Sequence, residues 1–245
     1  MEQQTAMKKL NVFITGASSG IGASAVQALC DAGHNVCGVA RNSDKLEVLS
    51  SDCASCEGSF VFTEGDVVNP LDLEKAVDFA IDKLGGIDVV IPNAGIGYFD
   101  PLEEGGLEEW KAMIDVNIMG VLGTIHTCLP HLLKSKGQVI NIGSVAARQV
   151  FPNSGIYCAT KHFILALSES LRLEFSNKIS VTTINPGAVN TEFILRTTNT
   201  GLREEYKPNF DTGMSPDFVA EAIVNAVEAR GKGIYSEITL RPDRI

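Results

Sequence analysis

A tyrosine and a lysine four residues apart form the first pair in the sequence that could do chemistry. Tyr157 and Lys161 fall early in a predicted helix, where this spacing puts both side chains on one face. A phenol has a reference pKa of about 10 and is a poor acid–base catalyst near neutrality. An ammonium about 5 Å away, at an effective dielectric constant of about 20, would stabilise the phenolate by roughly 3 kcal/mol, or about two pKa units. The pair therefore predicts an acid–base group, although an ordinary exposed helix pair has the same spacing.

Ser144 is the third candidate, because it ends a predicted strand shortly before this helix. Its neutral hydroxyl can donate a hydrogen bond to a carbonyl oxygen without competing for the proton. With Tyr157 as proton donor and Lys161 as electrostatic support, the three residues would suit the reduction of a carbonyl group, provided that a hydride source lies beside them.

Residues 12–22 form a strand, a glycine-rich turn and the start of a helix. The turn carries Gly16, Gly20 and Gly22, and glycine allows a sharp bend, close approach of an anion and tight packing of helix on strand. The free N–H groups and the positive end of the helix then predict a pyrophosphate site. No Gly-Lys-Ser/Thr follows, which argues against a P-loop NTPase. A Gly/Ser-rich connection that binds nothing is the alternative.

The elements that hold these motifs alternate along the whole chain, with apolar runs predicting strands and amphipathic stretches predicting helices. This alternation calls for an α/β fold with a parallel sheet, right-handed crossovers and helices on both faces. The last helix is the best bounded, with Ser215 as its N-cap, Pro216 in its first position and Gly231 just past its end. The predicted strands are residues 11–15, 35–39, 60–63, 88–91, 138–142, 180–184 and 237–240, and the predicted helices are 20–32, 43–50, 71–84, 107–135, 155–177 and 216–229.

Polar residues follow several of these strands at the point where each one ends. Asp66, Asn93, Ser144 and Asn185 hold such positions after the third to sixth strands. Each one alone is also what a plain turn looks like. Ligands of open parallel sheets bind beyond the carboxyl ends of the strands, so together these residues predict a site at that edge.

Length and composition fit one domain over residues 1–245, with 44% hydrophobic residues and no linker-like stretch. The net charge of −10 argues against nucleic acid and anionic membranes as partners, because like charges repel. We find no apolar run that looks long enough for a transmembrane helix, and residues 1–10 lack the apolar core of a signal peptide. A cytoplasmic location is therefore expected.

The six cysteines are expected to be reduced thiols, because a chain of this length does not need disulfides to be stable. Cys53 and Cys56 have the spacing of zinc ligands. Neither a second cysteine pair nor a histidine pair accompanies them, so we predict no metal site.

The motifs together resemble those of the classical short-chain dehydrogenase/reductase family, in order and spacing and over almost the whole chain. The resemblance implies a single Rossmann-type domain, a doubly wound sheet of seven parallel strands and a nicotinamide cofactor. It also implies that Asn117 joins Ser144, Tyr157 and Lys161 as a fourth catalytic residue and organises a water-linked proton relay through Lys161. The motifs are Thr15-Gly16-x3-Gly20-Ile21-Gly22, Asn93-Ala94-Gly95, Asn117, Ser144, Tyr157-x3-Lys161 and Pro186-Gly187.

The same resemblance implies which residues contact the cofactor. Asp66 and Val67 would contact the adenine, Lys161 the nicotinamide ribose, and residues 186–191 the nicotinamide amide. Pro92 stands where the family often has a second asparagine, which should matter little because Asn93 follows it. The full set is Gly16, Ser18, Ser19, Gly20, Ile21, Gly22, Arg41, Asn42, Asp66, Val67, Asn93, Ala94, Gly95, Tyr157, Lys161, Pro186, Gly187, Val189 and Thr191.

The residues after the second strand favour NADP(H) over NAD(H). Ala40 stands where NAD-using relatives typically carry an aspartate for the ribose 2′-hydroxyl, and Arg41 follows it. A guanidinium pairs well with a 2′-phosphate, and Asn42 and Ser43 offer further donors. A solvated loop arginine is the alternative.

A small carbonyl compound or secondary alcohol is the expected substrate, in a pocket formed by the segment after Gly95, residues 145–156 and a long mobile loop at 188–214. Arg148 could bind a substrate carboxylate or could be an ordinary surface arginine. The expected lining residues are Ile96, Tyr98, Ala146, Phe151, Asn153 and Phe193.

Two other functions compete with this one. A dinucleotide-binding sensor or scaffold would be expected to have lost a catalytic residue, whereas all four positions are filled here. A sugar-nucleotide epimerase normally needs a longer region after Gly187. The apolar helices at 107–135 and 155–177 suggest a homodimer or homotetramer by family resemblance, although core packing explains them equally well.

Overall fold

The computed structural model describes residues 9–243 and contains one sheet of seven parallel strands. The strand order is β3-β2-β1-β4-β5-β6-β7. From β1 the chain first adds strands on one side of the sheet and then, starting with β4, on the other, although β1 and β4 themselves are parallel. This arrangement confirms the predicted Rossmann-type, doubly wound α/β fold. The strands are β1 (Asn11–Thr15), β2 (Asn35–Ala40), β3 (Ser59–Glu64), β4 (Val89–Ile91), β5 (Gln138–Ile142), β6 (Ser180–Pro186) and β7 (Glu237–Leu240).

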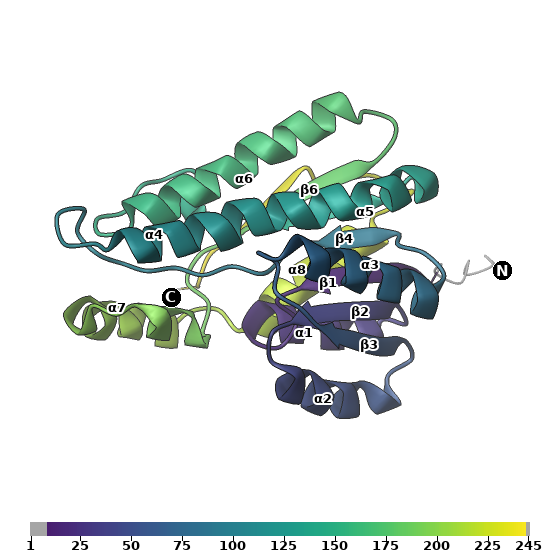
Figure 1. The fold of residues 1–245 in the computed structure, drawn as a ribbon, viewed down its shortest axis with the longest axis horizontal. Coiled ribbons are helices and arrows are strands. Elements are labelled where there is room, and N and C mark those ends of the chain that lie inside the picture. Colours follow the sequence, from purple (N-terminus) through teal and green to yellow (C-terminus); the bar gives the residue numbers. More distant parts are fainter. Residues whose placement is uncertain (1–8, 244–245) are drawn as a thin grey trace.

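Helices cover both faces of the sheet (Figure 1), because the central strands are apolar on both sides. Ile14 faces the core under α1 and α8, whereas its neighbour Phe13 faces the core under α3, α5 and α6. Both side chains are fully buried. The helices are α1 (Gly20–Asp31), α2 (Ser43–Asp52), α3 (Pro70–Leu84), α4 (Leu107–Ile114), α5 (Val121–Ser135), α6 (Gly155–Glu174), α7 (Thr200–Asp211) and α8 (Pro216–Glu228).

The predicted helix at 107–135 is interrupted by a π-helical stretch at Asp115–Gly120, which separates α4 from α5. The extra residue per turn changes the direction of side chains locally, and such stretches are frequent at functional sites. Asn117 lies within it. A hydrophobic pattern with helical period does not reveal this interruption, since the apolar residues on either side keep nearly the same face.

By length and composition, residues 107–135 also pass the test for a helix that could cross a membrane, so our expectation of no such run is wrong by that measure. In the folded chain, however, Val121, Ile125 and Leu132 of this segment pack into the core beneath the sheet. A core helix of an α/β domain meets the same criterion.

The loop predicted at 188–214 holds two elements that we did not predict. One is a 3₁₀ helix at Glu192–Arg196, and the other is α7, which stands apart from the sheet layers in Figure 1. None of the residues of α7 is buried, although its apolar residues Leu202, Tyr206 and Phe210 recur with helical spacing. We call residues 188–214 the lid. The Met214 N–H donates a hydrogen bond to the Ala188 carbonyl oxygen at 2.9 Å, which brings the two ends of the lid together.

The ends of α8 are as predicted: the Ser215 hydroxyl caps it by accepting from the Asp217 N–H, and Gly231 adopts a positive φ just beyond it. The six cysteines are free. Between residues 9 and 243, no group of three or more His, Cys, Asp or Glu side chains is arranged to hold a metal ion. The expectation about a signal peptide rests mainly on residues 1–8, which lie outside the described residues.

Candidate active site

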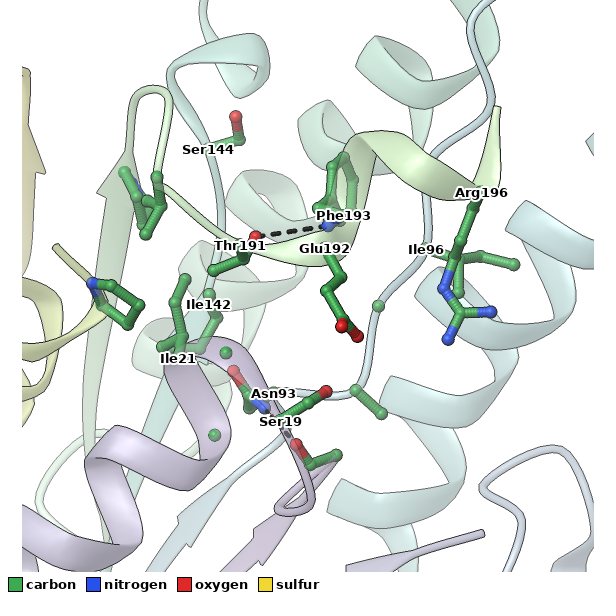
Figure 2. A pocket seen from close by; sticks show the side chains of 18 of the residues that line it. Ser19, Ile21, Asn93, Ile96, Ile142, Ser144, Thr191, Glu192, Phe193 and Arg196 are labelled. Carbon is green, nitrogen blue, oxygen red and sulfur yellow. Dashed lines mark hydrogen bonds between the residues drawn. The ribbon is translucent and has the colours of Figure 1, made fainter. Parts of the chain in front are cut away.

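A cleft of about 2020 Å³ opens at the carboxyl ends of the strands, between the glycine turn and the lid. Figure 2 shows Ser19 and Asn93 on one side of this space and Thr191, Glu192 and Phe193 of the lid across from them. The volume exceeds that of a typical small-molecule pocket, which leaves room for a dinucleotide and a substrate. All the residues expected to contact the cofactor line this one cleft, as do Ser144, Ile96, Ala146, Phe151 and Phe193.

The glycine turn has the shape that an anion site needs. Gly16 and Gly20 have φ values of 67° and 53°, which favour glycine. A Cβ on Gly22 would lie 2.1 Å from the Gly16 carbonyl oxygen, so any side chain there would push the turn apart. The Asn93 side chain fixes the turn from the end of β4 by donating to the carbonyl oxygens of Thr15 at 2.9 Å and Gly16 at 3.2 Å. The turn and the first turn of α1 therefore fit a pyrophosphate.

Ser144, Tyr157 and Lys161 meet where β5 ends and α6 begins. The Ser144 side chain lies near the Tyr157 phenol, whose pKa it lowers, and it accepts a hydrogen bond from the Ala146 N–H at 3.1 Å. Lys161 Nζ donates to the Ile142 carbonyl oxygen at 3.0 Å and lies 5.9 Å from the centre of the Tyr157 ring. The serine and the tyrosine thus present two hydroxyl groups to the same point in the cleft.

The protonation of this pair differs from our expectation that Lys161 lowers the pKa of Tyr157. Loss of water raises the pKa of Tyr157 to about 12, and the nearby Ser144 side chain counteracts part of that rise. Burial likewise lowers the pKa of Lys161 to about 8. Removal from water disfavours the charged form of either group, and this cost outweighs the attraction we calculated in a solvated pair. Tyr157 is therefore a neutral phenol at pH 7, a form that can donate a proton.

Asn117 is buried behind the cleft and does not line it. Its Nδ2 donates to the Ile96 carbonyl oxygen at 2.8 Å and to the Thr160 hydroxyl at 3.1 Å, and its Oδ1 accepts from the Ile96 N–H at 2.9 Å. The side chain thereby ties the segment after β4 to α6, one residue away from Lys161. A direct role in catalysis stays a prediction, whereas the hydrogen bonds make Asn117 a brace.

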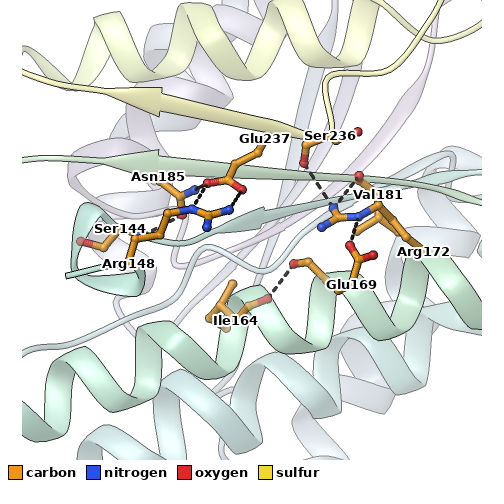
Figure 3. A network of polar contacts seen from close by, with 10 residues as sticks. Ser144, Arg148, Ile164, Glu169, Arg172, Val181, Asn185, Ser236 and Glu237 are labelled. Carbon is orange, nitrogen blue, oxygen red and sulfur yellow. Dashed lines mark hydrogen bonds and ion pairs between the residues drawn. The ribbon is translucent and has the colours of Figure 1, made fainter. Parts of the chain in front are cut away.

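A chain of polar side chains behind Ser144 was missed in the sequence (Figure 3). The buried Asn185 side chain accepts from the Ser144 N–H at 3.2 Å and donates to Glu237 at 2.8 Å. Arg148 makes two hydrogen bonds to the same carboxylate, which lowers the pKa of Glu237. The position of Asn185 at a strand end was the one available signal. Its partners come from distant parts of the chain and could not be read from spacing.

Three residues with an expected role at the substrate lie elsewhere. The Arg148 guanidinium is already bonded to Glu237 and does not line the cleft, so it is not placed to bind a substrate carboxylate. Tyr98 does not line the cleft either; its neighbour Phe99 does, because alternate residues of the extended segment face opposite sides. Asn153 is occupied by a hydrogen bond to the Tyr206 hydroxyl at 3.0 Å. Other cleft residues that we did not predict are Lys45, Phe99, Tyr206, Phe210 and Arg241.

Comparison with known proteins agrees with this geometry. Residues 10–200 match the short chain dehydrogenase family. The chain belongs to that family. Relatives over nearly the full length include an uncharacterized oxidoreductase of Staphylococcus saprophyticus, which is 36% identical over 94% of this chain and 95% of that protein.

Serine 3-dehydrogenase of Rhizobium radiobacter is 34% identical to this short-chain dehydrogenase over 88% of this chain and 85% of the relative. Among solved structures, an alcohol dehydrogenase of Thermococcus sibiricus complexed with 5-hydroxy-NADP superposes with a TM-score of 0.86, at 30% identity, over 96% of this chain and 97% of the other. This chain is accordingly an oxidoreductase of the short-chain dehydrogenase family.

Proposed function

We propose that this short-chain dehydrogenase transfers a hydride between NADP(H) and a carbonyl compound or secondary alcohol, with Tyr157 as the acid–base group. The observation that carries the proposal is that Ser144 and Tyr157 lie together in the same cleft as the glycine turn. The two hydroxyls converge, so one carbonyl oxygen can accept a hydrogen bond from each. A bound NADPH supplies the hydride, and Tyr157 supplies the proton.

Each of the other polar residues has a part in this reaction. Ser144 orients and polarises the carbonyl. Lys161, charged at pH 7, favours the phenolate that remains after proton transfer. Asn117 holds the segment beside α6 in place through its bonds to Ile96 and Thr160.

The proposed preference for NADP(H) rests on the region after β2. Ala40 is buried at the strand end, and no carboxylate takes its place to accept from a ribose 2′-hydroxyl. Arg41 and Lys45 line the cleft nearby. Arg41 lies 3.8 Å from Asp66, a loose and mostly exposed pair that a 2′-phosphate can replace. The NADP analogue bound by the Thermococcus sibiricus relative supports the same choice.

The experiment that tests the function is a comparison of NADPH and NADH oxidation in the presence of aldehydes and ketones. We expect NADPH to be used with a kcat/KM at least about tenfold higher, which corresponds to about 1.4 kcal/mol. The double variant Ala40→Asp, Arg41→Leu should reverse the preference. Equal use of both cofactors by the natural chain would contradict the assignment of NADP(H), and no oxidation with any carbonyl would contradict the function.

The expected homodimer or homotetramer belongs to the same proposal. Ile114, Met119, Leu133 and Leu173 are exposed apolar side chains on α4, the π-helical stretch, α5 and α6. Burial of such side chains favours association of two copies. Light scattering of the purified protein gives the number of copies.

A further inference from the structure

Five aromatic rings gather at the substrate end of the cleft. Tyr157 contacts Phe99 and Phe193, with ring centres 5.8 Å and 5.5 Å away. Phe99 also contacts Tyr206 at 5.9 Å, and Phe193 contacts Phe210 at 6.1 Å. These separations and the tilted or edge-on ring orientations are those that aromatic pairs prefer. We call the five residues the aromatic cluster; each of them lines the cleft.

The cluster joins the lid to the body of the domain. Phe99 follows β4 and Tyr157 lies in α6, whereas Phe193, Tyr206 and Phe210 belong to the lid. The Phe193 ring lies so close to the backbone below it that a Cβ on Gly97 would come within 2.5 Å of the ring. The rings of Tyr206 and Phe210 connect α7 to Phe99, which lies outside the lid.

Two polar groups near the rings already have a hydrogen-bond partner within the chain. The Tyr206 hydroxyl accepts from Asn153 at 3.0 Å and donates to the Pro152 carbonyl oxygen at 3.4 Å. Lys161 donates to the Ile142 carbonyl oxygen. A polar substrate group pushed among the rings would therefore lose its hydration and meet mainly ring carbon atoms in exchange. A flat apolar group would exchange ring-to-ring contacts for equivalent ring-to-ligand contacts.

Charged residues of the cleft lie mostly at other positions. Arg41, Asp44, Lys45 and Asp66 follow β2 and β3 at the dinucleotide end. In the part of the chain that the structure describes, Arg196 is the lid cation that lines the cleft, and it is exposed. Figure 2 shows its guanidinium well apart from Ser144.

We infer that the substrate carries an aromatic group bonded directly to the reacting carbonyl or carbinol carbon. The inference rests on the proposed function, because the position of the carbonyl is set by Ser144 and Tyr157. The Tyr157 ring itself belongs to the aromatic cluster, so a substituent next to the carbonyl carbon reaches the other rings. The lid rings must part to admit it and close over it afterwards, which excludes water from the reacting atoms.

The test uses the full chain with NADPH and three carbonyl compounds: acetophenone, its saturated counterpart cyclohexyl methyl ketone, and pyruvate. We expect kcat/KM for acetophenone to exceed that for the saturated ketone by roughly tenfold or more. The ratio of kcat/KM for acetophenone to that for pyruvate should be larger still. The variant Phe210→Leu keeps an apolar lid but removes one ring. It should raise KM for acetophenone roughly tenfold and leave KM for cyclohexyl methyl ketone nearly unchanged.

The matched control is Phe218→Leu, because Phe218 is an exposed aromatic residue of α8 outside the cleft. This variant should behave like the natural chain. NADPH binding, followed by fluorescence, and far-ultraviolet circular dichroism show that each variant is folded. Should Phe210→Leu fail to fold, Tyr206→Leu removes a second lid ring and carries the same expectation.

The outcomes separate this inference from the proposed function. Turnover of the saturated ketone equal to that of acetophenone, or an unchanged KM for acetophenone in a folded lid variant, overturns the aromatic substrate and leaves the dehydrogenase reaction standing. Preference for pyruvate that is lost in Arg196→Leu overturns it in favour of a keto acid. Absence of NADPH oxidation with all three compounds overturns both.

Discussion

Asn185 holds the backbone of Ser144 in place: its Oδ1 accepts the Ser144 N–H at 3.2 Å, while its Nδ2 donates to the Glu237 carboxylate at 2.8 Å (Figure 3). Both ends of the amide are therefore used, and its orientation is fixed. A Cβ on Gly143 would lie 2.1 Å from the same Oδ1, so the chain leaves space for this contact. Ser144, the serine that we propose polarises the carbonyl, is thus anchored from β7 through β6.

Replacement of Asn185 by leucine should lower kcat with little change in KM. The Ser144 N–H would lose its partner inside the protein, and a misplaced hydroxyl weakens an interaction made mainly in the transition state. We expect a loss of roughly tenfold to a hundredfold, measured by steady-state kinetics. Asn225→Leu, on the exposed face of α8, is the matched control. An equal decrease in both variants would speak against a positioning role for Asn185.

The pair of Arg148 and Glu237 should make stability depend on pH in acid. The hydrogen bond from Arg148 lowers the pKa of the Glu237 carboxyl below its ordinary value. A carboxylate with a lowered pKa in the folded state adds stability above its unfolded value, and this stability is lost as the pH falls through the folded value. Melting temperatures measured from pH 7 to about pH 3 should therefore fall more steeply for the natural chain than for Glu237→Gln. Parallel curves would show that the pair contributes nothing.

Lys161 should set the alkaline limit of the reduction. Burial places its pKa at about 8, so the ammonium is present below that pH and lost above it, whereas Tyr157, with a pKa of about 12, keeps its proton throughout this range. The rate of carbonyl reduction should be level below pH 8 and decline above it. In Lys161→Arg the guanidinium stays charged, so the decline should move to higher pH even if the overall rate drops. An unchanged alkaline limb in that variant would assign it to another group.

Gly22 should be essential to the dinucleotide site. A side chain there collides with the Gly16 carbonyl oxygen, since the Cβ would lie 2.1 Å away. Gly22→Ala should weaken NADPH binding by a factor of about 100, because the turn can no longer approach the pyrophosphate closely. Gly86→Ala is the matched control, because a Cβ there meets nothing within 4 Å. Calorimetry or fluorescence titration measures both; wild-type affinity in Gly22→Ala would remove the turn from the binding site.

Local patterns in the sequence predicted what local interactions determine. The glycine turn with the strand before it and the helix after it, and the cap at Ser215 with its helix, each depend on residues close together in the sequence, and the structure has all of them. Alternation of elements was enough for the parallel sheet, because right-handed crossovers leave few ways to assemble it. The spacing of Tyr157 and Lys161 likewise placed both on one face of α6.

Features that depend on contacts between distant parts of the chain could not be predicted from the sequence. The helix α7 has no buried face, and its contacts are made through rings that meet Phe99 from another segment. The hydrogen bonds of Asn185 join β5, β6 and β7. The pKa of Tyr157 is raised mainly because folding removes water from its side chain. The spacing of four residues indicates that Lys161 is near, but it does not indicate how deeply either side chain is buried.

The most direct test of Tyr157 as the proton donor compares Tyr157→Phe with the control Tyr235→Phe, which alters an exposed tyrosine outside the cleft. The measurement is the single-turnover rate of NADPH oxidation with a reducible carbonyl, with NADPH affinity measured on the same samples. We predict that Tyr157→Phe binds NADPH as the natural chain does and loses about a thousandfold in rate, whereas Tyr235→Phe is unchanged. Acid–base catalysis usually contributes a factor of ~10²–10⁴ to the rate. A Tyr157→Phe variant whose rate stays within about tenfold of that of the natural chain would therefore contradict the proposed mechanism.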